Sequence, residues 1–181
     1  MTGALLIAVA GVLMVSGLAH LVHFERSRAA VADQHVVAAG LAGPLVVALI
    51  VAEVAFGGGT AVAVTSGSSS QIVWGLLCAA LFVAFAGYVH LAWLRRTRRD
   101  VLCACGVGEA PLGLWVTLRS GLLAALALFG AVFASSGGAW LDRPAFELTI
   151  LVCAAVAVSV AVTVLPVARA PLSALSPEAI Q

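Results

Sequence analysis

The hydrophobic positions of the chain form five long apolar runs, separated by short segments that are polar or rich in glycine and serine. Each run is close to the ~20 residues that an α-helix needs to cross the hydrocarbon core of a bilayer. The pattern therefore predicts five transmembrane helices. They are expected at residues 4–22, 36–56, 72–94, 116–133 and 146–165.

Composition strengthens this prediction. The 181 residues are 63% hydrophobic and 9% charged, and a soluble domain of this size could not hide so much apolar surface in one core. We expect an all-α, polytopic membrane helix bundle that forms one domain over residues 1–169. The tail at residues 170–181 contains two prolines and several small residues and has little to bury, so we expect it to be flexible.

The arginines predict how the bundle is oriented. All nine basic residues are arginine, and six of them follow the first or the third predicted span, whereas residues 57–71 carry no charge. The positive-inside rule then places the N-terminus outside and the C-terminus in the cytoplasm, as in a multi-pass protein of a bacterial-type inner membrane. Residues 57–70 are expected to form a low-complexity loop outside. The six arginines are Arg26, Arg28, Arg95, Arg96, Arg98 and Arg99.

Two cysteines stand in the connection after the third span. Cys103 and Cys105 are separated by one residue, and such a pair can form a strained, labile disulfide or a mixed disulfide with a partner. The nearby Arg96, Arg98 and Arg99 would favour the reactive thiolate. The alternatives are half of a metal site, or two small loop residues without a chemical role. Cys78 and Cys153 fall within spans and are expected to serve only as packing residues.

Histidines approach the same predicted membrane face. His20 and His23 end the first span and His90 lies near the end of the third, so a His/Cys metal site or a proton-handling cluster is one hypothesis. The other is that these side chains simply reach the interface. No pair has the helical spacing of an embedded metal motif.

Glu53 and Arg119 are charged residues that lie within apolar runs. Glu53 lies near the outer end of the predicted second span, where an intramembrane carboxylate indicates a functional or helix-packing role. Its alternative role is an interfacial side chain that extends outward to water. Arg119, at the start of the fourth span, is interpreted as an interfacial anchor or as the partner of a carboxylate.

The order of these features resembles the MauE family of methylamine-utilisation membrane proteins, a family similar to the DoxX-like helical bundles. Members typically carry Cys-Gly-Cys-Phe-Gly, then a Trp and an Arg-Asn pair. The chain differs at Ala104, at Val107, at Ser120 and at His20, where Lys is common. The resemblance rests on Gly17-Leu18-Ala19-His20-Leu21, Ala52-Glu53-Val54-Ala55-Phe56-Gly57, Cys103-Ala104-Cys105-Gly106 and Leu114-Trp115-Val116-Thr117-Leu118-Arg119.

The resemblance implies a four-helix core plus one further helix, and a role for Cys103 and Cys105 in thiol-disulfide handling during maturation of a partner protein. A thioredoxin-like protein would be that partner, with Glu53 and the arginines in support. A non-catalytic accessory subunit of a larger membrane complex and a His/Cys metal-binding protein are the rival hypotheses. We expect no cofactor, although a quinone or a metal stays open, and no nucleic-acid partner. Enzymatic activity, which would be of thiol-disulfide oxidoreductase type, also stays open.

Overall fold

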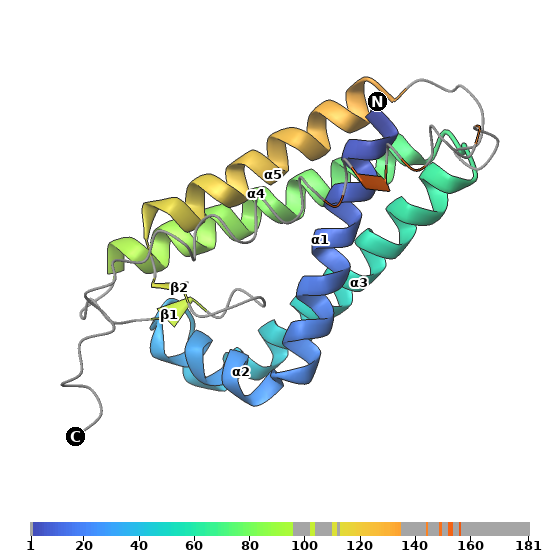
Figure 1. The fold of residues 1–181 in the computed structure, drawn as a ribbon. Coiled ribbons are helices and arrows are strands. Elements are labelled where there is room, and N and C mark those ends of the chain that lie inside the picture. Colours follow the sequence, from blue (N-terminus) through green and yellow to red (C-terminus); the bar gives the residue numbers. More distant parts are fainter. Residues whose placement is uncertain are drawn as a thin grey trace, which may run out of the picture.

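The computed structural model describes residues 2–95, 102–103, 110–111, 113–134, 144, 149, 152–153 and 156. Within these residues the chain is almost entirely helical, and the all-α prediction is confirmed. The elements are α1 (Thr2–Val22), α2 (Phe24–Asp33), a 3-10 turn (Ala39–Leu41), α3 (Ala42–Thr65), α4 (Gln71–Arg95), β1 (Leu102–Cys103), β2 (Ala110–Pro111) and α5 (Leu114–Val132), as Figure 1 shows.

Four of the described helices are long and apolar enough to cross a membrane. They cover Gly3–Val22, Ala39–Thr65, Gln71–Arg95 and Leu114–Val132, and so match the first four predicted spans in order. The predicted fifth span lies mostly outside the described residues, and the predicted tail lies wholly outside them. The chain is therefore a multi-pass membrane protein with at least these four spans.

The long helices pack as two pairs, α1 with α3 and α4 with α5. In Figure 1 the two pairs meet near the N-terminus and draw apart towards α2. The main core lies where the pairs meet. Its fully buried side chains include Val9 and Leu13 of α1, Cys78 of α4, and Ala127 of α5.

Small residues allow α4 and α5 to approach closely. A Cβ atom built at Gly75 of α4 would lie only 2.8 Å from Cβ of Ala131 of α5, and 3.1 Å from Cδ2 of Leu6 of α1. Because lipid is as apolar as a leucine side chain, membrane helices associate largely through such close packing. Gly75 therefore lies at the point where the two pairs are joined.

The prediction of a loop at residues 57–70 was wrong. Helix α3 continues to Thr65, and only a short turn at 66–70 leads to α4. The glycines in this segment allow neighbouring helices to pack closely, and they do not end the helix. A Cβ atom at Gly57 would lie 3.0 Å from the Ala10 carbonyl oxygen, and one at Gly59 would lie 2.6 Å from the Trp74 ring. Continuing the helix also satisfies the backbone hydrogen bonds internally, as the bilayer requires.

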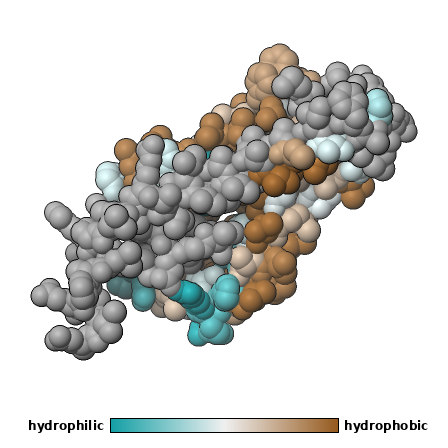
Figure 2. Space-filling view, viewed as in Figure 1, coloured by the Kyte–Doolittle hydropathy of each residue, from teal (hydrophilic) through white to brown (hydrophobic). Residues whose placement is uncertain are grey.

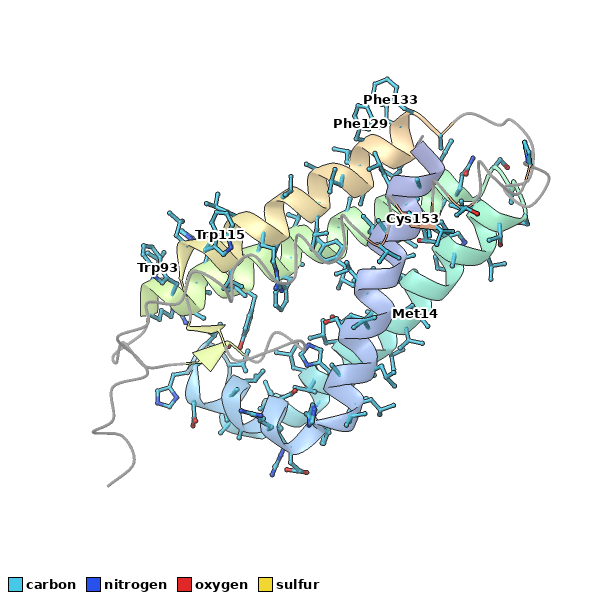
Figure 3. All side chains as sticks on the ribbon, viewed as in Figure 1. Met14, Trp93, Trp115, Phe129, Phe133 and Cys153 are labelled. Carbon is cyan, nitrogen blue, oxygen red and sulfur yellow. The ribbon has the colours of Figure 1, made fainter. Side chains whose placement is uncertain are left out.

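Much of the remaining surface is hydrophobic. Large apolar side chains on all four long helices are exposed, and Figure 2 shows the hydrophobic surface over the helices and a hydrophilic patch towards α2. Bulky aromatic residues lie near both ends of the α4/α5 pair, as Figure 3 shows. Trp93 and Trp115 are at one end, and Phe129 and Phe133, with ring centroids 4.5 Å apart, are at the other. This surface fits a lipid bilayer.

Candidate functional site

Cys103 lies in a short hairpin at one end of the bundle. The strands β1 and β2 pair antiparallel, with Leu102 opposite Pro111 and Cys103 opposite Ala110. The hairpin connects the end of α4 to the start of α5, and Figure 1 places it near α2. The first cysteine is thus held in a backbone-paired connection outside the helices.

The other residues of the predicted redox site cannot be placed beside Cys103. Cys105 and the three arginines that were expected to favour its thiolate lie outside the described residues, so their proximity stays a prediction. The three arginines are Arg96, Arg98 and Arg99.

Glu53 occupies the middle of α3, because the helix extends well beyond the predicted end of its span. Only 6% of the residue is exposed. Its Oε1 atom accepts a hydrogen bond of 2.8 Å from the Ser16 hydroxyl of α1. A side chain that extends outward to water is therefore excluded, and the placement of Glu53 near the outer end of its helix was wrong.

A glycine of α1 makes room for this carboxylate. A Cβ atom built at Gly17 would lie 3.2 Å from Cβ of Glu53 and 3.1 Å from Cγ2 of Val54. The absence of a side chain at Gly17 therefore brings the backbone of α1 close to α3 at the level of Glu53. The carboxylate is enclosed between two helices and does not face lipid.

His20 extends the buried polar cluster towards α2. It is 3% exposed, and its Nε2 atom lies 4.0 Å from Glu53 Oε1. Its other ring nitrogen, Nδ1, lies 3.0 Å from the hydroxyl of Ser27, a buried residue of α2. We call Ser16, His20, Ser27 and Glu53 the polar chain, since these four side chains connect the middle of α3 to α2.

The sequence analysis missed Ser16 and Ser27. Ser16 and His20 are four residues apart and so share one face of α1, a spacing that could have linked them. Ser27 offered no such signal, because α2 was not predicted as a helix. Its ten residues are too polar and too few for a membrane span.

The remaining candidate residues do not join the polar chain. His23 is exposed, and the ring of His90 packs beside Trp93 with centroids 5.6 Å apart. His90 Nδ1 and Arg119 Nε are buried without a hydrogen-bond partner among the described residues. No group of three or more His, Cys, Asp or Glu residues that could hold a metal occurs in the described part of the chain.

The family model for the methylamine utilisation protein MauE matches residues 1–133. The chain belongs to the MauE family. This match covers Cys103, Cys105, the whole polar chain and Arg119, so every predicted site residue lies within the family region. Comparisons of the chain with curated proteins and with solved structures found no match.

Replacing Ser27 with alanine is expected to destabilise the bundle of this MauE-family protein by about 0.5–1.5 kcal/mol, because His20 Nδ1 would lose its hydrogen-bond partner. The measurement is the free energy of unfolding in mixed micelles. Ser69→Ala is the control, since Ser69 is exposed and should change stability by less than about 0.5 kcal/mol. Equal stabilities of the two variants would contradict the contribution of Ser27.

Proposed function

We propose that this MauE-family protein is a membrane thiol-disulfide exchange protein that acts in the maturation of a partner protein through Cys103 and Cys105. The observation that carries the proposal is the position of Cys103 in β1, in a connection outside the membrane-spanning helices. Cys105 follows two residues later in the segment that joins β1 to β2. A connection between spans can be reached by a protein partner, whereas Cys78 is fully buried within a span.

The proposed reaction is dithiol-disulfide exchange. The thiolate of one cysteine attacks a disulfide sulfur of the partner, forms a mixed disulfide and releases a partner thiolate. The second cysteine then attacks the mixed disulfide, which forms a Cys103–Cys105 disulfide and releases the second partner thiol. Two electrons and two protons thereby pass from the pair to the partner, and the reverse sequence oxidises the partner. A thioredoxin-like protein fits this chemistry.

The proposed location follows from the charges at the hairpin end. Arg28 belongs to α2 and Arg95 ends α4, so both lie at the same end of the bundle as Cys103. The positive-inside rule supports a cytoplasmic position for this end in a bacterial-type inner membrane, with the N-terminus outside and the C-terminus inside. The family name supports a partner involved in methylamine utilisation.

Side-resolved maleimide labelling of Cys103 and Cys105 tests both the chemistry and the orientation. In inverted vesicles, where the cytoplasmic face is exposed, labelling is expected only after reduction, and intact cells should give no labelling with an impermeant reagent. The readout is mass spectrometry of the peptide that contains both cysteines.

Two other outcomes would contradict the proposal. Complete labelling without reduction in every growth condition would indicate a plain dithiol, and would favour the non-catalytic accessory subunit. Labelling from the outside of intact cells would overturn the orientation. Cys78 serves as an internal control, because it is fully buried in α4 and should stay unlabelled in the folded protein.

A further inference from the structure

We propose that Glu53 and His20 form a proton-binding site within the membrane, which exchanges protons with the α2 end of the bundle through Ser27. The ligand is a proton shared between a carboxyl group and an imidazole. This site does not depend on the two cysteines, and nothing in the proposed thiol exchange requires it.

The first argument is the incomplete hydrogen bonding of the Glu53 carboxylate. Ser16 donates to Oε1, but Oε2 is buried and has no hydrogen-bond partner among the described residues. An ionised carboxylate inside a membrane helix is expensive, and an unsatisfied oxygen adds to that cost. A proton bound by the carboxyl removes the charge, and a proton bound by His20 supplies a countercharge. Either position reduces the cost, so the pair favours one bound proton.

The second argument is that the geometry accommodates the proton on either group. The 4.0 Å between His20 Nε2 and Glu53 Oε1 is within ion-pair range but longer than a hydrogen bond. The Ser16 hydroxyl can donate to Oε1 whether or not Oε2 carries a proton, because a carbonyl oxygen also accepts. Ser27 can accept from a protonated Nδ1 or donate to an unprotonated one, because a hydroxyl group does both. Neither form requires the helices to move.

The third argument is the direction of the polar chain. From the middle of α3 it passes through His20 near the end of α1 to Ser27 of α2. Helix α2 is polar, and its exposed Glu25 and Arg28 form an ion pair of 2.7 Å. Protons that arrive at this polar helix therefore meet a chain of exchangeable groups that ends at Glu53.

No other ionisable group on the neighbouring helices satisfies the free Oε2 atom of Glu53 in place of a proton. Tyr88 and His90 of α4 and Arg119 of α5 have buried polar atoms, but none of them donates a hydrogen bond to the free Oε2 atom. On α3 Glu53 is the single ionisable side chain. The other ionisable groups near the polar chain lie on α2 or at its N-terminal end, and none of them belongs to the chain: His23, Glu25, Arg26, Arg28 and Asp33.

Infrared difference spectroscopy of the full-length protein in lipid nanodiscs tests the site. Titration across about pH 5 to 8, where histidine ordinarily changes charge, should change the carbonyl band of a protonated carboxyl, and this band should shift in D₂O. Glu53→Gln is expected to abolish the pH-dependent band, whereas Glu53→Asp should retain a carboxyl band. Glu25→Gln is the matched control and should leave the band unchanged. A band that persists in Glu53→Gln, or no such band in the unmodified protein, would overturn the proposal.

A second measurement needs no Glu53 variant and so covers the case in which the variants fail to fold. A hydrophobic carbodiimide reacts with protonated carboxyl groups, and mass spectrometry should locate the modification at Glu53 and show that it falls several-fold as the pH rises. Absence of modification at Glu53 would overturn the proposal.

The exchange of protons through Ser27 is tested by Ser27→Ala, which should slow hydrogen-deuterium exchange of the Glu53 carboxyl several-fold. An unchanged exchange rate would overturn the role of Ser27.

Discussion

A serine substitution at one cysteine of the Cys103/Cys105 pair is expected to accumulate a covalent complex with the partner protein. The attacking thiolate still forms the mixed disulfide, but the second thiol that would release the partner is missing. Of Cys103→Ser and Cys105→Ser, the variant that keeps the attacking cysteine should therefore trap the partner. The measurement is a non-reducing gel of membranes, followed by mass spectrometry of the band that disappears on reduction.

Two controls distinguish this expectation from accidental crosslinking. The double variant Cys103→Ser/Cys105→Ser should form no complex and should leave the oxidation state of the partner's cysteines unchanged. Cys78→Ser should behave as the unmodified protein, since that thiol lies within α4 and contacts the Thr60 hydroxyl at 3.2 Å. A double variant that still changes the partner's disulfide state would exclude the redox role of Cys103 and Cys105.

Replacing Gly75 with valine is expected to destabilise the bundle by about 1–3 kcal/mol, because the new side chain has no room. Even its Cβ atom would lie 2.8 Å from Cβ of Ala131, and Leu6 of α1 closes the other side at 3.1 Å. The helices must separate or the neighbouring side chains must leave their preferred rotamers. The measurement is the free energy of unfolding in mixed micelles, followed by circular dichroism.

The same helix provides the matched control for Gly75. A Cβ atom at Gly87 would meet nothing within 4 Å, so Gly87→Val should cost much less than Gly75→Val. Removing the contacted methyl group with Ala131→Gly should recover part of the loss in a Gly75→Val background, as expected for residues in contact. Equal effects of Gly75→Val and Gly87→Val would show that the joint between the helix pairs is not tightly packed.

The sequence was sufficient to predict the order of the four described spans and the approximate limits of three of them. The thickness of the bilayer sets the length and apolar content that each span needs. This requirement applies to each segment alone, so it can be recognised without knowing the tertiary structure. The same local information failed at residues 57–65. There the glycines look like the start of a loop, whereas Gly57 and Gly59 face Ala10 and Trp74 on other helices. Whether a glycine ends a helix or lets a neighbour approach depends on tertiary packing.

The candidate sites show the same division. Glu53 could be recognised from its cost in an apolar run, and His20 from its position at a span end, but their pairing with each other could not be predicted. It depends on the close approach of α1 and α3 at Gly17 and on how the two helices are rotated. The sequence also indicated the cysteine connection, yet the register that places Cys103 opposite Ala110 is a property of the folded hairpin.

The pairing of α1 with α3 and of α4 with α5 has a consequence for how the chain enters the membrane. Each pair consists of long helices that follow one another in the sequence, so each pair can form before the next pair is synthesised. The insertion machinery can therefore deliver the described spans as two helical hairpins, each with its main contacts already made. The contact between the two pairs, with the main core and the seam around Gly75, Leu6 and Ala131, is left to close in the lipid phase.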